Sequence, residues 1–258
     1  MLIGTWNVNL RSSITSTPAS DKAAWIQHLG VDVWLLAEVH ADWRPRGREL
    51  IVSPERQFDP GKQRWAGIDT CLPHVPLRTA GDPEHAGEES LVLARLQVDD
   101  AKLPTVLVAC SVLPWKNPGD LWPRLPGGGQ AEKFRHILDH HVRRIDSERQ
   151  DGEPLIWGGD FNQHLNRPFE GATVEGQKAL REGFSFLGLL VLTERAEHLD
   201  PGMYSIDHLA VSSCLVAGEQ IAGVHRPAWE GRKLSDHPAY TAIVGLQTPC
   251  GRDGAASS

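Results

Sequence analysis

Gly159-Asp160-Phe161-Asn162 is the stretch that decides the fold, together with the apolar run Pro154-Leu155-Ile156-Trp157 that precedes it. The apolar run is typical of a short buried strand. An Asp and an Asn two residues apart, where such a strand surfaces, can direct both side chains into one cleft. Because Asp and Asn are also favoured in turns, the motif gains its weight from further polar residues that end other apolar runs.

The overall composition is that of an ordinary globular protein. The chain has 258 residues, of which 40% are hydrophobic and 23% are charged. Its 26 Lys and Arg residues against 33 Asp and Glu residues give a net charge of -7. This balance excludes a uniformly basic surface that coats nucleic acid, but it leaves room for a local basic patch.

The sequence shows no targeting segment and no membrane span. Met1 leads directly into the apolar residues 2–6, without the basic region and long apolar region of a signal peptide. The longest apolar stretches, such as residues 186–192, are too short to span a bilayer. We therefore expect a cytoplasmic protein without a transmembrane segment.

The four cysteines show no CxxC spacing; they are Cys71, Cys110, Cys214 and Cys250. We expect small buried side chains and a thiol in the C-terminal tail, rather than a zinc site or a disulfide framework.

Strands and helices alternate along the chain. Apolar runs rich in Val, Leu and Ile predict strands at residues 2–6, 31–36, 66–72, 90–98, 105–113, 155–157, 204–212 and 238–246. Helical periodicity predicts helices at residues 21–29, with Ser20 as N-cap, and at 131–149 and 174–186. Residues 114–130 form a long loop rich in Pro and Gly. The pattern predicts one mixed α/β domain over residues 1–246, followed by a flexible tail at 247–258.

Seven polar residues lie at the ends of the predicted strands: Asn7, Glu38, Asp160, Asn162, Asp207, Asp236 and His237. Mg²⁺ prefers oxygen ligands, so Glu38 is the first candidate metal ligand, with Asn7 and Asp236 assisting, and Mn²⁺ is an alternative ion. Asp160 is a candidate base for a water molecule. Asn162 and His237 are candidates to stabilise phosphate charge, and Asp207 to orient the histidine.

Each of these residues also has a structural interpretation. Asp160 and Asn162 could form a plain turn, as could Asp236 and His237. Glu38 could be a solvated strand end, and Asp207 could belong to a buried salt bridge.

Five short motifs occur in the order and spacing of a known family: Thr5-Trp6-Asn7, Leu36-Ala37-Glu38-Val39, Gly159-Asp160-Phe161-Asn162, Ile206-Asp207-His208 and Ser235-Asp236-His237. Across residues 2–246 the chain resembles the endonuclease/exonuclease/phosphatase (DNase I-like) superfamily. The resemblance implies a four-layer α/β sandwich of two packed mixed β-sheets flanked by helices. It also implies Mg²⁺-dependent cleavage of phosphoesters.

The resemblance also implies roles for the individual residues. It assigns Asn7 and Glu38 to the metal, with Asp236 near it, Asp160 to the water, Asn162 to the phosphate, and His237 to the scissile phosphate with Asp207 behind it.

One position departs from the family pattern. Val112 falls where the family usually has a His or Tyr, and Trp115 falls where AP endonucleases commonly have an Asn. One phosphate donor is therefore missing, and Lys116 or Arg124 on the adjoining loop could supply positive charge instead.

Three loops beside the motifs combine tryptophan with basic residues: residues 43–48 with Trp43, Arg44, Arg46 and Arg48; residues 115–124 with Trp115, Lys116, Trp122 and Arg124; and residues 226–233 with Trp229. Aromatic rings interleaved with cations suit unpaired bases and backbone phosphates, and they also suit lipid headgroups. The alternative is that the tryptophans pack in the core and the arginines are solvated. His164, shortly after the Asp160 motif, is a further candidate substrate contact.

His136 and His140 stand four residues apart on a predicted helix, which is a spacing that can bind zinc. No third ligand is apparent, so a solvated helix face is the favoured interpretation.

These observations favour a Mg²⁺-dependent hydrolase of phosphodiester bonds, most readily a nuclease acting on DNA or RNA. A phosphatase or phosphodiesterase acting on inositol or lipid phosphates is the second hypothesis. A non-catalytic binding protein with the same fold is the third, and Val112 is the residue that supports it. No protein partner can be inferred from the sequence.

Overall fold

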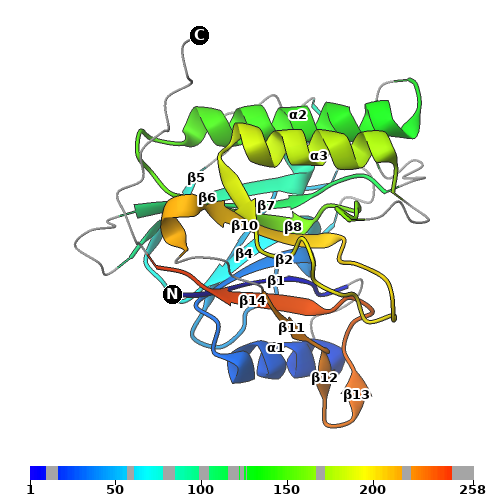
Figure 1. Ribbon diagram of the computed structural model, residues 1–258. Helices are drawn as coiled ribbons and strands as arrows, with labels where there is room; N and C mark the ends of the chain where they lie inside the picture. Colours follow the sequence, from blue (N-terminus) through cyan, green and yellow to red (C-terminus); the bar gives the residue numbers. More distant parts are fainter. Residues whose placement is uncertain are drawn as a thin grey trace.

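Two six-stranded sheets pack face to face, with helices on both outer sides (Figure 1). The computed structural model describes residues 1–9, 17–56, 61–77, 85–98, 105–115, 122, 125, 127–166, 172–216 and 222–245, and leaves out the side chains of residues 17 and 18.

The first sheet has the strand order β11-β14-β1-β2-β4-β3. Its strands are β1 (Leu2–Asn7), β2 (Val33–His40), β3 (Glu49–Val52), β4 (Gln63–Thr70), β11 (Gly223–His225) and β14 (Ala239–Ile243). Only β1 and β2 run parallel; the other neighbours are antiparallel. Because β1 and β2 are parallel, their carboxyl ends lie at the same edge.

The second sheet has the order β5-β6-β7-β8-β10-β9. Its strands are β5 (His74–Leu77), β6 (Leu91–Gln97), β7 (Thr105–Val112), β8 (Leu155–Asp160), β9 (Leu189–Val191) and β10 (Asp207–Ser212). Here β7 and β8 are the parallel pair, and β10 runs antiparallel to β8 with Asp207 opposite Asp160. The start of β10 and the end of β8 therefore meet.

Helices α2 (Gln130–Glu148) and α3 (Val174–Phe186) cover the second sheet, and α1 (Thr17–Leu29) covers the first (Figure 1). A small hairpin, β12 (Ala228–Trp229) and β13 (Arg232–Lys233), lies beyond α1, and two 3-10 turns span Glu88–Ser90 and Ser213–Leu215. Helix α3 begins at a true cap, because the Thr173 side chain accepts a hydrogen bond from the Gly176 amide at 2.9 Å.

Strand β8 is buried on both faces, which explains why its sequence is continuously apolar. Ile156 faces the core between the sheets, with Val108 and Leu209. Leu155 and Trp157 face the opposite way, into the core under α2 and α3. A polar residue at the end of such a strand has little freedom, so Asp160 is held at a fixed place.

The four-layer α/β sandwich expected from the sequence is confirmed. Several boundaries differ. Helix α1 begins at Thr17, so Ser20 lies inside the helix and is not its N-cap. Glu38 lies within β2 rather than after it, and β10 begins only at Asp207. The short strands β3, β5, β9 and β11 were not predicted, because each has only three or four residues and short runs carry little periodic signal.

Cysteine usage also differs in part from the expectation. Cys71 and Cys110 are free, and Cys110 is buried as expected. Cys71, in contrast, is exposed, and Cys214 is disulfide-bonded. Cys250 and the predicted tail at 247–258 lie outside the described residues.

No helix within the described ranges has the length and apolar character that crossing a membrane requires.

Gly159 allows β8 to approach β7 closely just before the Asp160 motif. Its φ is +133°, and a Cβ at this position would lie 2.0 Å from the Ser111 carbonyl oxygen. We expect Gly159→Ala to lower the free energy of unfolding by about 3–5 kcal/mol, because backbone strain and overlap with β7 add together.

Gly188 is the matched control, since its φ is +66° but a Cβ there would meet open space. Gly188→Ala should cost only about 1 kcal/mol, the strain alone. Urea denaturation of both variants makes the comparison, and equal losses would contradict the steric explanation.

Candidate functional site

The polar residues singled out by the sequence meet at one edge of the sandwich. Asn7 ends β1, Glu38 lies near the end of β2, and Asp160 ends β8. Asp207 begins β10, and Asp236 and His237 lie in the turn before β14. Both sheets therefore contribute side chains to the site.

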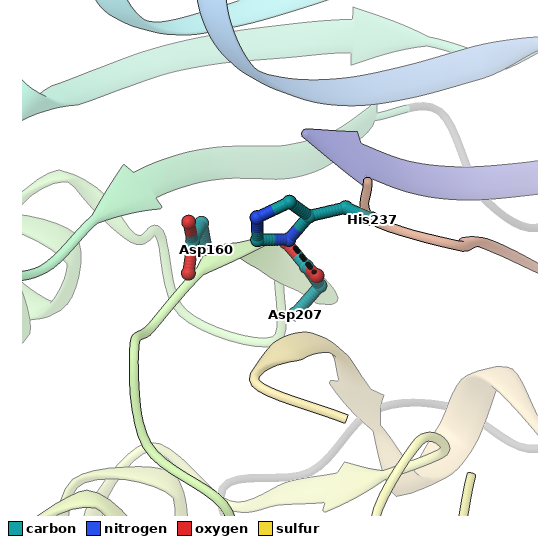
Figure 2. Close-up of side chains that lie close together, drawn as sticks. All are labelled: Asp160, Asp207 and His237. Atoms are coloured by element: carbon teal, nitrogen blue, oxygen red, sulfur yellow. Dashed lines mark hydrogen bonds and ion pairs between the residues drawn. The ribbon is translucent and has the colours of Figure 1, made fainter. Parts of the chain in front are cut away.

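Three of these side chains form a compact group in the centre (Figure 2). His237 Nδ1 lies 2.8 Å from Asp207 Oδ2, and one ligand atom from each of Asp160, Asp207 and His237 lies within 4.8 Å of the others. The second ring nitrogen, Nε2, points toward the Asp160 carboxylate (Figure 2). The imidazole thus stands between two carboxylates.

The ionisation of this group follows from its surroundings. Burial opposes a charge on His237, but the charge and hydrogen bond of Asp207, aided by Asp160 and Asp236, outweigh it and raise the pKa of His237 to about 10. Burial, and then the charge of Asp207, raises the pKa of Asp160 to about 7. His237 is therefore a cation at neutral pH, and Asp160 is a carboxyl group that titrates near neutrality.

Asn7 joins the two sheets by hydrogen bonds. Its amide nitrogen donates to Asp160 Oδ2 at 3.0 Å and to Glu38 Oε1 at 3.5 Å. Its amide oxygen accepts from the backbone N–H of Asn9 at 2.9 Å. In this orientation the nitrogen of Asn7, and not its oxygen, faces the carboxylates, so the side chain positions Asp160 and Glu38.

The turn that carries His237 is tied to β1. The Ser235 hydroxyl donates to the Asn7 carbonyl at 2.8 Å and accepts from the His237 backbone N–H at 3.1 Å. The Trp6 indole donates to the His237 carbonyl at 3.3 Å. These bonds fix the backbone from which the imidazole projects.

Unusual backbone conformations concentrate at the site. Four described non-glycine residues have positive φ, and three of them are Asn9 (+46°), Glu38 (+53°) and Asn162 (+51°). Asn162 donates from its amide to the Leu113 carbonyl at 2.9 Å, and its backbone N–H donates to Asp160 Oδ1 at 3.0 Å. Such conformations are uncommon and cluster at functional sites.

Asn9 is a site residue that the sequence analysis missed. Its amide nitrogen donates to Asp236 Oδ1 at 3.1 Å. Asp236 is exposed, and its pKa is lowered, since His237 and this hydrogen bond outweigh the effect of burial. The spacing of Asn7 and Asn9, two residues apart like Asp160 and Asn162, was a signal that could have identified it.

His198 is a second missed residue, and no motif marked it. Its ring lies 5.9 Å from the His237 ring, centroid to centroid, with the planes at 76°. Burial lowers the pKa of His198, so this neighbour of His237 is a neutral imidazole.

The predicted substrate contacts are dispersed. Arg44 and Arg46 are exposed in the segment that follows β2, and the Arg44 guanidinium donates to the Ala41 and Trp43 carbonyls. Trp229 packs against His28 of α1, with ring centroids 5.6 Å apart. His164 is buried. Burial lowers the pKa of His164, although hydrogen bonds to the backbone of Tyr204 and Ser205 act in the opposite direction. Lys116 and Arg124 lie outside the described residues.

The expected aromatic rim is largely wrong. Trp43 and Trp122 are buried, and Trp122 stacks on Trp65 with centroids 5.3 Å apart. Trp115, partly buried, contacts the edge of Trp65 at 5.9 Å. Arg48 forms an ion pair with buried Asp69. These residues pack because each finds a neighbour distant in sequence, and they offer no open platform for bases.

Val112 lies in the core under α2 and α3 and is opposite Asp160 in the β7–β8 register. The strand end that could carry a polar side chain beside Asp160 therefore carries a buried apolar one.

The structure does bring a third histidine to His136 and His140. The His85 ring stacks on both, with centroids 4.3 Å and 3.9 Å away and planes within 13°. His140 Nε2 is bonded to Glu88 at 2.8 Å, and Gly87 donates its N–H to His85 Nδ1 at 3.0 Å. Parallel rings direct their nitrogens side by side rather than at one point, so this stack does not present a metal site.

The donor set around Glu38 fits a hard divalent cation. Glu38 and Asp236 carry carboxylate oxygens on β2 and on the turn before β14, and carboxylate oxygen is the type of ligand that Mg²⁺ and Mn²⁺ prefer. Asp207 Oδ1 is buried without a hydrogen-bond partner among the described residues. The imidazolium of His237 is a hydrogen-bond donor and has no lone pair for a metal.

Comparisons with known proteins agree with this geometry. A model of the endonuclease/exonuclease/phosphatase family matches residues 4–237. A search of curated protein sequences finds no match.

Solved structures share the fold at low sequence identity. An AP endonuclease from Archaeoglobus fulgidus has a TM-score of 0.67 at 15% identity, over 95% of this chain and 100% of that chain. AP endonuclease LMAP from Leishmania major has a TM-score of 0.62 at 17% identity, over 96% and 88%. The endonuclease domain of TRAS1, a telomere-specific non-LTR retrotransposon, has a TM-score of 0.60 at 15% identity, over 96% and 99%.

The Asp207–His237 pair gives a testable titration. In EDTA we expect His237 to titrate near pH 10, and Asp207→Asn to lower its pKa toward the ordinary value of about 6.5, because burial is then opposed only by the weaker effects of Asp160 and Asp236. The contribution of this pair to the free energy of unfolding is fully present below about pH 6.5, and it is lost as the pH rises through about 10.

NMR titration of the His237 ring measures the shift. Asp236→Asn is the matched control and should lower the pKa of His237 much less, since Asp236 has the smallest effect of the three carboxylates on it. A His237 pKa that is the same in wild type and Asp207→Asn would contradict the assignment.

Proposed function

Because this chain belongs to the endonuclease/exonuclease/phosphatase family, we propose that it is a divalent-cation-dependent phosphodiesterase that cleaves nucleic acid. The observation that carries the proposal is the Asp160–Asp207–His237 group, in which a partly buried imidazolium stands between two carboxylates at the meeting edge of both sheets.

Asp160 is the residue that takes the proton from the attacking water. Asn7 and the Asn162 backbone N–H hold its two carboxylate oxygens at 3.0 Å each, so the side chain is oriented before substrate arrives. A base is most effective when its pKa lies near the working pH, and the pKa of Asp160 is about 7.

His237 is the residue that donates to the scissile phosphate. Asp207 keeps its Nδ1 occupied at 2.8 Å and its ring charged, which leaves Nε2 on the side of Asp160 (Figure 2). Negative charge collects on the phosphate oxygens in the transition state, and a preorganised cationic donor stabilises it there.

Glu38 and Asp236 are the residues that would hold Mg²⁺ or Mn²⁺, with Asn7 orienting Glu38. When bound, such an ion neutralises charge on the phosphate oxygens and orients the phosphate. Glu38 and Asp236 come from β2 and from the turn before β14, so the ion also depends on the first sheet being correctly assembled.

Nucleic acid is the proposed substrate because of the positive charge on the segment that follows Glu38 in the sequence. Arg44 and Arg46 are exposed on the segment that follows β2, whereas the whole chain carries a charge of -7. Several similar structures are themselves described as endonucleases. A local cationic segment on an acidic protein favours binding at one place rather than along the whole surface.

We expect Mg²⁺-dependent cleavage of a polynucleotide in a panel of plasmid DNA, single-stranded DNA, RNA, a bis-aryl phosphodiester and an inositol phosphate. Asp160→Asn and His237→Gln should each lower kcat at least about 100-fold, and EDTA should abolish turnover. Glu175→Gln, which removes one negative charge from an exposed position of α3, should leave kcat unchanged.

The panel also separates the alternatives. Turnover of the inositol phosphate alone would overturn the nuclease proposal in favour of a phosphatase. Binding of DNA without turnover, unaffected by Asp160→Asn, would identify a binding protein instead.

Arg44 and Arg46 should contribute to binding and not to chemistry. We expect Arg44→Gln/Arg46→Gln to raise KM for DNA with kcat unchanged, and to reduce the slope of log affinity against log salt by roughly 2, since two phosphate contacts are lost. Arg135→Gln/Lys178→Met, on α2 and α3, makes the same change in net charge and should alter neither quantity. Equal effects of the two double variants would contradict a local binding surface.

A further inference from the structure

A buried lysine is hydrogen-bonded to the chain segment from which Asn9 contacts Asp236. Lys22 belongs to α1 (Thr17–Leu29), yet only 5% of it is exposed. Lysines are almost never buried to this degree unless they are paired. The burial of this ammonium group therefore points to a role that a solvated lysine on a helix surface does not have.

The hydrogen bonds of Lys22 are directed at the end of β1. Its Nζ donates to the Val8 carbonyl and, at 3.2 Å, to the Asn9 carbonyl. These two residues follow β1 directly, and Asn9 has the left-handed φ of +46°. Lys22 thus holds the short turn in which the first strand leaves the sheet.

This turn positions the acidic residues of the site. Asn7 donates to Asp160 and Glu38, and Asn9 donates to Asp236 at 3.1 Å. The Asn9 N–H also holds the Asn7 side chain in its orientation. Three carboxylates from both sheets are therefore fixed through the backbone segment that Lys22 contacts.

Lys22 also acts through its charge. Burial lowers its pKa, while the negative charges of Asp236 and Glu38 act in the opposite direction. The geometry agrees, because Asn9 accepts from the Lys22 ammonium with its carbonyl at 3.2 Å and donates to Asp236 with its amide at 3.1 Å, so one residue separates the ammonium from Asp236. Because the ammonium is buried, it cannot reach a substrate phosphate.

We propose that Lys22 is the internal counter-ion of the metal site, a positioning residue that stabilises Glu38 and Asp236 before a divalent cation binds. This inference rests on the proposed function, because it takes Glu38 and Asp236 as the metal-binding residues. Its physical consequence is a competition: a fixed positive charge beside the carboxylates stabilises the metal-free protein and repels an incoming cation.

The competition distinguishes a counter-ion from a simple structural tether. Loss of a tether would loosen the turn and weaken cation binding. Loss of a counter-ion would destabilise the metal-free protein, yet strengthen cation binding, since the carboxylates would no longer have a competing positive charge. The two roles therefore predict opposite signs for the change in cation affinity.

The experiment compares wild type, Lys22→Met and a control, Lys178→Met, which removes a charge from an exposed position of α3. Mn²⁺ binding is measured by calorimetry and by electron paramagnetic resonance, and melting temperatures are measured in EDTA and in saturating Mg²⁺. We expect Lys22→Met to bind Mn²⁺ about three- to tenfold more tightly. It should melt about 5 °C lower in EDTA, with most of the difference removed by Mg²⁺, while Lys178→Met behaves as wild type.

Weaker Mn²⁺ binding in Lys22→Met, or a loss of stability that Mg²⁺ does not relieve, would overturn the counter-ion role in favour of a tether. Unchanged affinity and stability would also overturn it. If Lys22→Met does not fold, Lys22→Met/Asp236→Asn decides: recovery of folding supports charge compensation, and continued failure contradicts it.

The outcomes also separate this inference from the proposed function. Wild type that binds no Mn²⁺ overturns both. Wild type that binds Mn²⁺ but hydrolyses nothing in the panel overturns only the proposed function.

Discussion

The contact between Asp207 and His237 is the interaction on which the site depends, because it joins the two sheets where their carboxylates converge. Asp207 begins a strand of the second sheet, and His237 precedes a strand of the first. Asp160, Glu38 and Asp236 lie at the same edge, and like charges this close oppose one another. The partly buried imidazolium of His237, together with the Asn7 amide that also links the two sheets, allows this concentration of acidic groups in a folded protein. The charges of the site therefore help to hold the two sheets together at this edge.

The strands deliver these groups by leaving regular geometry at their ends. Asn9, Glu38 and Asn162 all adopt left-handed conformations, which cost free energy for residues with a side chain. At Asn162 the conformation lets the backbone N–H reach Asp160, and at Asn9 it accompanies the hydrogen bond to Asp236. The rigid, doubly buried strand β8 supplies the fixed frame against which this strain can be held. Local strain and deep burial therefore act together: the first directs the side chains, and the second keeps them there.

Local sequence patterns were sufficient for a mixed α/β domain and for the principal residues, whereas the four-layer arrangement came from the family resemblance. A continuously apolar strand that ends in a polar residue predicts where that residue surfaces, so Asn7, Glu38, Asp160, Asp207 and His237 could be gathered without a structure. Contacts between distant segments had no such pattern. Trp122 looked like a rim residue, but it stacks on Trp65, and nothing in residues 115–124 indicates that partner. Lys22 and His85 likewise acquire meaning only from segments far away in the chain. The same reasoning applies to Asn7: its residue type suggests a metal ligand, whereas the backbone N–H of Asn9 turns its amide nitrogen toward the carboxylates.

Val112 fills one side of the site with an apolar side chain, so the groups that balance charge must lie on the other side. It is opposite Asp160 in the β7–β8 register and belongs to the same apolar cluster as Trp65 and Trp122. This flank of Asp160 is therefore closed by hydrophobic packing, and within the described residues it offers no cationic donor from β7. Under the proposed function, negative charge that develops on a bound phosphate must then be balanced by the His237 cation and by the metal ion that Glu38 and Asp236 would hold. The site is therefore asymmetric: the His237 cation and its carboxylate neighbours lie on one side, and apolar side chains lie on the other. Because β7 contributes no second donor, we expect stabilisation of the phosphate charge to depend strongly on the protonation of His237.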